Sequence, residues 1–418
     1  MKIRELVEAK ARTAKEVAQA LALCSTRVKD DALNQMARGL EEKAATLLEA
    51  NRADLERARA GGHARAFLDR LMLTESRIEE MAHGLRQIAQ LPDPVGKVVE
   101  AWRRPNGLEI SRVRVPLGVI GFIYESRPNV TADAAGLSIK SGNAVILRGG
   151  SEALESNSVI VTVLAKALEK TGIPPEALQF IDTPDREAVM ALLTLDRYVD
   201  LIIARGGEEF VRLVAKEATV PVLKHDKGLC HVFVDEDADP AVAVEIAVNA
   251  KVQRPSVCNA MESLLVHQAI APRFLPEVAK RFEAAGVELR GCPRTCALVP
   301  GTRPALPADW DTEYLDLVLS VRVVDSFDEA VAHIRAHGTG VAEAIVTSHY
   351  GRARRFAHEV DAAAVLVNAS TRLVDGGQFG MGAEMGVSTS KLHARGPVGV
   401  EELTTTKFVV LGAGHIRE

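Results

Sequence analysis

The amino-acid sequence predicts an α/β protein with two doubly wound parallel sheets and a small β extension. Between residues 118 and 223, short apolar runs alternate with segments of helix length, and the same alternation returns between residues 231 and 368. Strands that alternate with helices form parallel sheets whose faces the helices cover. Two β-prone segments, LEISRVRVPLG (108–118) and TTTKFVVLG (404–412), lie outside both regions and would form the extension.

The first 93 residues are expected to be helical, because their apolar residues recur at helical spacing. This pattern predicts helices at 3–21, 32–60 and 74–90. Thr74 is suited to cap the third helix, since its hydroxyl can accept a backbone N–H and Glu75 follows in the first turn. The segment LPDP (91–94) then interrupts the helical pattern.

The first α/β region opens with GVIGFIY (118–124), a continuous apolar run that is typical of a strand buried on both faces. Further strands are expected at 144–147, 178–181, 199–204 and 220–223, with helices at 131–140, 154–170, 186–193 and 208–216 between them. Doubly wound sheets bind ligands beyond the carboxyl ends of their strands. We therefore consider the residues that follow two of these strands.

Arg148 follows the strand at 144–147, and Gly206-Gly207 follow the strand at 199–204 directly before a helix. At such a strand end an acidic residue would suit the ribose hydroxyls of a dinucleotide, whereas an arginine suits a 2′-phosphate. Glycines let a phosphate-bearing ligand approach the backbone and a helix N-terminus. Ordinary turns also contain Gly-Gly, so each feature alone is weak.

The second α/β region is expected to have strands at 231–234, 317–324, 343–348 and 364–368, and helices at 240–251, 272–285, 325–337 and 352–360. Within it, NAKVQRPSVCNAMESLLV (249–266) contains Cys258. Pro255 favours a sharp turn, and Asn259 could cap a helix carrying Met261 and Leu264, although 263–267 also fits a strand. A thiol at a helix N-terminus has a lowered pKa, which makes Cys258 a candidate nucleophile. A small buried cysteine is the alternative.

Composition excludes several classes of function. With 51 Lys and Arg against 56 Asp and Glu, the net charge is −5 and no basic block suggests nucleic acid or an anionic membrane. No apolar run approaches a membrane span, and the N-terminus lacks the apolar core of a signal peptide, so a cytoplasmic location is expected. The five cysteines are scattered and expected to be free thiols. Cys292 and Cys296 lack a zinc-like partner pair, so we expect a surface turn there and no metal.

Four segments in the right order resemble the aldehyde dehydrogenase superfamily and, within it, the γ-glutamyl phosphate reductase family. They are PLGVIGFIYESRPNVTADAAGLSIKSGNAVILRGG, QRPSVCNAMESLLVH, EYLDLVLSVRVVDSFDEAVAHI and DGGQFGMGAEMGVSTSKLHARGPVGVEELTTTKFVV. The resemblance covers nearly the whole chain. It implies an aldehyde dehydrogenase-like fold with a nucleotide (NADP)-binding domain at 1–101 and 117–235, a catalytic domain at 236–395, and a β oligomerisation extension at 102–116 and 396–418.

The resemblance also implies roles for individual residues. Cys258 would be the nucleophile that forms a thioacyl enzyme. Asn129, in SRPNVT, would hold the developing oxyanion together with the backbone N–H of Cys258. The same asparagine, next to Pro128, could instead be a turn residue.

Cofactor contacts follow from the same resemblance. Arg148 takes the place of a lysine that contacts the cofactor ribose in many relatives, and Gly206 and Gly207 would lie near the nucleotide. Glu313, in EYLDL, would contact the nicotinamide ribose or, alternatively, be a solvated surface charge. The implied cofactor is NADPH/NADP.

One departure bears on the reaction. Hydrolytic relatives carry a glutamate base in the segment that corresponds here to VLKHDKGLCHVFVD, where this chain has Lys224, His225, Asp226 and Lys227. Without a positioned base, water is poorly activated against a thioester, and cationic groups suit a phosphate. In GTGVAEAIVTS, Val341 stands where relatives more often show histidine, so no role is assigned there.

The resemblance therefore implies NADPH-dependent reduction of L-glutamyl 5-phosphate to L-glutamate 5-semialdehyde with release of phosphate, the second step of proline biosynthesis. The expected partners are this small-molecule substrate and further copies of the chain. An association with glutamate 5-kinase, which supplies the acyl phosphate, is left open. The alternatives are an acylating dehydrogenase that uses coenzyme A, a hydrolytic aldehyde dehydrogenase, and a binding protein that has lost the chemistry.

Overall fold

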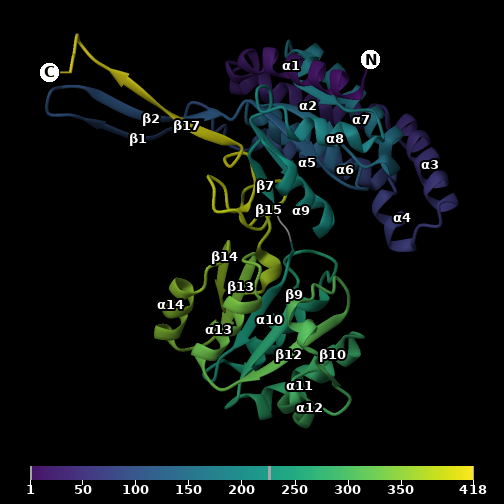
Figure 1. Cartoon of the computed structure of the whole chain (residues 1–418), viewed down its shortest axis with the longest axis vertical. Coiled ribbons are helices and arrows are strands. Elements are labelled where there is room, and N and C mark those ends of the chain that lie inside the picture. The colour runs from purple at the N-terminus through teal and green to yellow at the C-terminus, as the bar shows by residue number, and fades with distance from the viewer. Residues whose placement is uncertain (1, 225–226, 418) are drawn as a thin grey trace. The chain divides into compact units, whose positions relative to one another are not determined.

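The computed structural model describes residues 2–224 and 227–417. The chain forms two compact units, which are described separately (Figure 1). Unit 1 comprises Met1–Lys224, Gly380–Gly386 and Leu392–Glu418, and unit 2 comprises His225–Phe379 and Val387–Lys391. The domain boundary expected after residue 235 therefore lies earlier, because the strand at Cys230–Val234 hydrogen-bonds within the sheet of unit 2.

Helices form the N-terminal part of unit 1, as expected. They are α1 (Ile3–Ala22), α2 (Thr26–Glu42), α3 (Ala44–Ala60), α4 (Arg65–Leu71) and α5 (Glu75–Gln90). The single helix predicted at 32–60 is wrong, because Lys43 leaves helical geometry (φ −108°, ψ 17°) and separates α2 from α3. The predicted cap is confirmed, since the Thr74 hydroxyl accepts the backbone N–H of Arg77 at 3.2 Å.

A parallel five-stranded sheet forms the centre of unit 1, in the order β5-β4-β3-β6-β7. Its strands are β3 (Val119–Ile123), β4 (Ala144–Arg148), β5 (Leu178–Phe180), β6 (Leu201–Ala204) and β7 (Val222–Lys224), and the connecting helices are α6 (Asn129–Lys140), α7 (Leu154–Lys170), α8 (Arg186–Leu193) and α9 (Glu208–Glu217). Phe122 packs with α2, α5, α6 and α7, whereas its neighbour Ile123 packs with α1 and α8. This burial on both faces explains the continuous apolar run.

The strand order of this sheet reverses between β3 and β6, which are neighbours. Such a switch point leaves a crevice beyond the carboxyl ends of the two strands. Glu125 follows β3 there, and Arg205-Gly206-Gly207 follow β6. Of the two loops that were singled out from the sequence, the Gly206-Gly207 loop lies at this switch point, whereas Arg148 ends β4 on the other side of β3.

The β extension is a three-stranded antiparallel sheet in the order β1-β2-β17, with β1 at Val98–Arg103, β2 at Glu109–Pro116 and β17 at Thr404–Leu411 (Figure 1). The expected pairing of the two β-prone segments is confirmed, with Lys407 opposite Val113. The sheet begins earlier than the predicted boundary at residue 102, because β1 starts at Val98 and pairs with β2.

Unit 2 contains a parallel seven-stranded sheet in the order β11-β10-β12-β9-β8-β13-β14. The strands are β8 (Cys230–Val234), β9 (Met261–His267), β10 (Glu288–Gly291), β11 (Arg303–Pro304), β12 (Val318–Val324), β13 (Ala342–Val346) and β14 (Ala364–Val367), and the helices are α10 (Pro240–Val252), α11 (Ala271–Ala284), α12 (Pro293–Leu298), α13 (Phe327–His337) and α14 (Tyr350–Glu359). The surface turn expected at Cys292–Cys296 is wrong. Cys292 is the N-cap residue of α12, which starts at Pro293 because proline suits the first helical position, where an N–H would be unpaired in any case.

We expect Asp54→Ala to destabilise unit 1. The buried Asp54 carboxylate accepts the backbone N–H of Ser156 at 2.8 Å and its hydroxyl at 2.6 Å, near the start of α7. Losing it leaves buried donors unpaired, at a cost of about 3 kcal/mol. Calorimetry should show a lower unfolding temperature. Asp69→Ala is the control, because Asp69 forms an exposed pair with Arg77 and should change stability by no more than about 0.5 kcal/mol. Equal effects of the two substitutions would contradict the assignment.

Candidate active site

Cys258 lies in the loop of residues 253–260, which joins the end of α10 to the start of β9. The helix predicted after Asn259 is wrong. Met261–His267 is a fully buried strand between β8 and β12, and short apolar runs of this kind fit either element. Stabilisation of the thiolate by the dipole of that helix is therefore also wrong.

The Cys258 loop lies at the amino ends of the central strands of unit 2. Gly228 and Leu229 precede β8, Ala260 precedes β9, and Thr339 precedes β13. The backbone N–H of Leu229 donates to the Thr339 hydroxyl at 2.9 Å, which joins two of these approaches. The site in unit 2 is thus built on the edge opposite to the one at which doubly wound sheets usually bind ligands.

Gly228 packs directly against the backbone of Cys258. A Cβ at position 228 would lie 2.3 Å from the carbonyl oxygen of Cys258 and 2.5 Å from its Cα, so no side chain fits there. The backbone N–H of Gly228 donates to Glu313 Oε1 at 2.9 Å. The structure therefore brings two of the predicted site residues, Cys258 and Glu313, to the same glycine.

Cys230 is a neighbour of Cys258 and is not itself a candidate nucleophile. Its Sγ donates to the carbonyl oxygen of Cys258 at 3.3 Å, and the side chain is fully buried. Burial, together with the nearby Glu343 carboxylate, raises the pKa of Cys230 well above its ordinary value. The Cys230 thiol thus stays protonated and helps to hold the loop, while Cys258 is only half-buried.

Arg372 supplies the electrostatic support that the predicted helix does not. It donates to the side chains of Asn259 and of Gln253, the latter at 2.9 Å, and Asn259 in turn donates to the carbonyl of Val374 at 2.8 Å. Burial and the neighbouring Arg254 lower the pKa of Arg372, whereas interaction with Cys258 raises it. The guanidinium and a Cys258 thiolate therefore stabilise one another, and Asn259 braces the loop.

Asn129 is exposed at the first position of α6 in unit 1. One turn further on, burial raises the pKa of Asp133 to about 6, an effect opposed by Arg205 and by a hydrogen bond from Asn129. The asparagine amide is thus oriented by a carboxyl group on its own helix. An exposed amide in this position can donate to a ligand.

Arg148 ends β4 and is nearly buried. Its guanidinium donates to the carbonyls of Gly149 at 2.9 Å and Pro184 at 3.0 Å, and its buried Nε has no partner among the described residues. Burial lowers the pKa of Arg148, as does the nearby Arg186. Arg148 therefore braces the loops after β4 and β5, and Arg186, an exposed cation at the start of α8, was missed in the sequence.

Gly206 and Gly207 separate β6 from α9 and differ in their surroundings. A Cβ on Gly206 would lie 2.8 Å from both Glu125 Oε1 and Phe210, whereas a Cβ on Gly207 would meet nothing within 4 Å. Gly207 is the N-cap of α9, and its N–H donates to Glu125 Oε1 at 3.3 Å. The space beside Gly207 at the start of α9 is therefore open to a ligand, and a phosphate there would compete with Glu125 for the Gly207 N–H.

The predicted site residues thus fall into two groups. Cys258 and Glu313 lie together in unit 2, whereas Asn129, Arg148, Gly206 and Gly207 belong to unit 1. His225 and Asp226, two of the four residues in place of the hydrolytic glutamate, lie outside the described residues. Sequence reasoning missed Gly228 and Arg372. The segments that contain them, KGLCH (227–231) and STR (370–372), match no motif that was considered. The roles of these two residues arise from contacts with residues far away in the chain.

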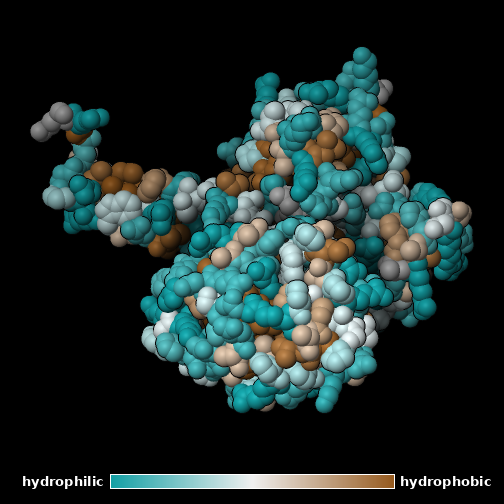
Figure 2. Space-filling view, turned by 60° about the horizontal axis from the view of Figure 1, so that its bottom comes forward, coloured by the Kyte–Doolittle hydropathy of each residue, from teal (hydrophilic) through white to brown (hydrophobic). Residues whose placement is uncertain are grey.

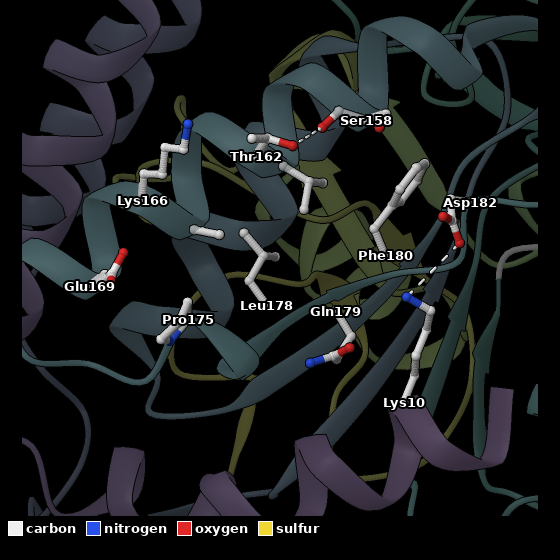
Figure 3. A pocket seen from close by; sticks show the side chains of 12 residues that line it. Lys10, Ser158, Thr162, Lys166, Glu169, Pro175, Leu178, Gln179, Phe180 and Asp182 are labelled. Atoms are coloured by element: carbon white, nitrogen blue, oxygen red, sulfur yellow. Dashed lines mark hydrogen bonds and ion pairs between the residues drawn. The ribbon is translucent and has the colours of Figure 1, made fainter. Parts of the chain in front are cut away.

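A cavity of about 370 Å³ in unit 1 lies apart from these residues (Figure 3). It is bordered by α1, α7 and the edge strand β5. Lys10 and Asp182 face one another at its rim, 3.9 Å apart. None of the predicted site residues is among those that line it, within the part of the chain that the structure describes. The cavity therefore contributes nothing to the candidate active site.

Two further properties concern the described residues only. No group of three or more His, Cys, Asp or Glu side chains among residues 2–224 and 227–417 is placed to hold a metal ion. None of the helices in those ranges has the length and apolar character needed to cross a membrane.

Comparison with known proteins identifies the family. The sequence profile of the aldehyde dehydrogenase family matches residues 2–293 and 310–409. The γ-glutamyl phosphate reductase of Heliobacterium modesticaldum is 56% identical over 408 residues, 98% of each chain, and that of Desulfatibacillum aliphaticivorans is 54% identical over 417 residues, 100% of each. The chain belongs to the aldehyde dehydrogenase family, among its γ-glutamyl phosphate reductases. It is an oxidoreductase.

Solved structures agree with this assignment. The crystal structure of γ-glutamyl phosphate reductase from Thermotoga maritima is 50% identical to this aldehyde dehydrogenase family member, with a TM-score of 0.97 over 99% of this chain and 100% of the other. Glyceraldehyde-3-phosphate dehydrogenase GapN from Methanocaldococcus jannaschii, solved with NADP, shares the fold at 18% identity, with a TM-score of 0.69 over 98% and 94% of the two chains. The expected aldehyde dehydrogenase fold is confirmed.

We expect Gly228→Ala to abolish most activity with little effect on overall folding. A methyl group at 228 would displace the Cys258 backbone, and misplacing a nucleophile by about 1 Å can cost on the order of 100-fold in rate. Steady-state turnover and circular dichroism test this. Gly351→Ala is the control, since its Cβ would meet only the side chain of His349. Full activity in Gly228→Ala would show that the close packing on Cys258 is not needed.

Proposed function

We propose that this protein reduces L-glutamyl 5-phosphate to L-glutamate 5-semialdehyde with NADPH and releases phosphate, the second step of proline biosynthesis. The observation that carries the proposal is identity of 52–56% to γ-glutamyl phosphate reductases over essentially the full length of the chain. Cys258, held in a loop beside Gly228, is the group around which the chemistry is proposed.

In the proposed mechanism, the Cys258 thiolate attacks the carbonyl carbon of the acyl phosphate. The C–O bond to phosphate breaks, and a thioester forms on Cys258 without strong acid assistance, because phosphate is a good leaving group. Bound NADPH supplies the hydride that reduces this thioester. The C–S bond then breaks, which releases the aldehyde and restores the thiolate.

Asn129 and the backbone N–H of Cys258 are proposed to donate to the oxyanion of each tetrahedral state. Donors of this kind stabilise charge that develops only on the way to the product. Two features support these roles. The Asn129 amide is exposed and oriented by Asp133, and the backbone of Cys258 is fixed by Gly228.

The proposed cofactor contacts are Gly206, Gly207, Arg148 and Glu313. The open backbone at Gly207 suits the cofactor pyrophosphate, since α9 begins there. Arg148 would meet the ribose with its remaining donors. Glu313, next to Cys258 through Gly228, would bind the nicotinamide ribose. These assignments agree with the NAD(P) chemistry of the aldehyde dehydrogenase family.

The proposed route favours phosphate over water as the acyl acceptor in the reverse direction. Lys224 and Lys227 replace a general base in this segment, and lysines at neutral pH are cationic. A cation attracts phosphate and does not deprotonate water. This separates the proposal from the hydrolytic alternative, while coenzyme A remains the competitor that an experiment must exclude.

The three domains are proposed to serve nucleotide binding, catalysis and oligomerisation, as expected from the sequence. The extension supports the last role, because apolar side chains gather on its exposed strands (Figure 2). Trp102, Phe408, Val410 and Leu411 are 36–63% exposed there. An uncovered β-sheet with such side chains is prone to association, so we propose that other copies of the chain cover it.

The reverse reaction tests the proposed function. We expect glutamate 5-semialdehyde to reduce NADP⁺ only when inorganic phosphate is present, and Cys258→Ser to abolish turnover. The absorbance of NADPH provides the readout. Turnover without phosphate would mean that water accepts the acyl group. Turnover with coenzyme A in place of phosphate would leave only the family assignment standing.

A substitution at Gly207 tests the cofactor site. Because a Cβ at this position meets nothing within 4 Å, Gly207→Ala should fold normally yet hinder the approach of the pyrophosphate. We expect the Kd for NADP⁺ to rise by about tenfold, which corresponds to about 1.4 kcal/mol. Fluorescence titration measures the Kd and calorimetry the stability. An unchanged Kd would place the pyrophosphate elsewhere.

A further inference from the structure

A buried ion pair closes the loop that carries Cys258. Lys251 lies in the last turn of α10 and Glu262 in the first part of β9, so the two residues flank the loop of residues 253–260. Lys251 Nζ lies 2.6 Å from Glu262 Oε2, and both side chains are fully buried. The ends of the loop are therefore joined by one short, desolvated contact.

The second oxygen of the same carboxylate holds another segment. Glu262 Oε1 accepts the backbone N–H of Leu315 at 3.1 Å. Leu315 has φ +54°, a left-handed conformation that costs a branched residue free energy and persists only when its surroundings impose it. Glu262 is thus the buried group that fixes an unfavourable backbone conformation.

That conformation places Glu313. Tyr314, between Glu313 and Leu315, is held by hydrogen bonds from its hydroxyl to Ser320 at 2.7 Å and to Asp309 at 3.0 Å. With Tyr314 and Leu315 fixed, the Glu313 carboxylate meets the N–H of Gly228 at 2.9 Å, and Gly228 packs on Cys258. Both carboxylate oxygens of Glu262 are therefore connected to the Cys258 loop, and we call these connections its two arms. Oε2 reaches the loop through Lys251 at the end of α10, and Oε1 reaches it through Leu315 and Glu313.

Stability alone does not explain the pair. Burial raises the pKa of Glu262 and lowers the pKa of Lys251, so the protein opposes both charges that form the contact. Buried ion pairs can often be replaced by neutral side chains with no loss of stability. Retaining this one at the base of the Cys258 loop points to a positioning role.

We propose that Glu262 is a positioning residue that holds Cys258 through Lys251 and Glu313 through Leu315. The inference rests on the proposed function, which makes Cys258 the nucleophile and Glu313 a cofactor contact. Glu262 itself touches neither substrate nor cofactor. A single carboxylate would thus fix the positions of the nucleophile and of the cofactor contact relative to one another.

Glu262→Gln tests the proposal, because the variant keeps the shape of the side chain but has one oxygen where the carboxylate uses two. One arm must fail, since an amide nitrogen cannot accept a hydrogen bond from Lys251 or from Leu315. We expect the rate of Cys258 alkylation by iodoacetamide to change, or the Kd for NADP⁺ to rise, by about tenfold. The unfolding temperature should also fall, because Lys251 remains buried without its counter-ion.

The double variant Lys251→Met/Glu262→Gln separates positioning from stability. We expect it to recover the unfolding temperature of the wild type, since no buried charge remains, while the defect in alkylation or in NADP⁺ binding persists. Recovery of both properties would show that the pair has a structural role only, and would overturn the proposal. Glu245→Gln is the matched control, because Glu245 of α10 forms an exposed pair with Arg281 at 2.7 Å.

Leu315→Gly provides a rescue. Glycine adopts a positive φ without cost, so in a Glu262→Ala background, where both arms are lost, it should restore NADP⁺ binding and leave the alkylation defect unchanged. A rescue of neither or of both would contradict the two-arm arrangement. Alkylation and NADP⁺ binding do not require turnover. The variants could behave as expected in both assays while the wild-type enzyme shows no phosphate-dependent reaction. That outcome would disprove the proposed function without affecting this inference.

Discussion

The contact between the backbones of Gly228 and Cys258 is the constraint on which the Cys258 loop depends. It arises from the parallel pairing of β8 with β9, which brings the segments that enter the two strands side by side. Because a side chain at position 228 would overlap the Cys258 backbone, glycine is required there. The N–H of this glycine also binds Glu313, and the Cys230 thiol binds the carbonyl of Cys258. The loop is thus fixed through its main chain, which leaves the Cys258 side chain available for chemistry.

The two sheets offer opposite edges to their sites. In unit 1, the predicted nucleotide loops follow the carboxyl ends of β4 and β6, and the β6 loop lies at the switch point, where the topology of such sheets leads one to expect a ligand. In unit 2, the Cys258 loop and its supports precede β8, β9 and β13. The loops that precede these strands have conformations that are set by tertiary contacts. The contacts of the buried Glu262 and the partly buried Arg372 with this region are of that kind.

The two neighbouring thiols, Cys258 and Cys230, differ in their surroundings. Cys230 is fully buried near Glu343, and both conditions raise its pKa. Cys258 is half-buried and interacts favourably with Arg372. A guanidinium near the thiolate has the same electrostatic effect as a helix N-terminus, but it comes from a residue more than a hundred positions away in the chain. The two thiols are therefore distinguished by burial, since Arg372 interacts favourably with both.

The sequence by itself determined the fold class and most element positions, and it singled out Cys258 as the candidate nucleophile. Buried strands such as GVIGFIY show as continuous apolar runs, helix caps such as Thr74 have a local signal, and motifs around Cys258 and Asn129 are contiguous in the chain. It did not decide whether Met261–His267 was helix or strand, because a short apolar run fits either until its neighbours are known. Only the tertiary structure joined Glu262 to Lys251 and Leu315 and brought Gly228 against Cys258. These features depend on contacts between residues distant in sequence, and such contacts leave no periodic or local pattern.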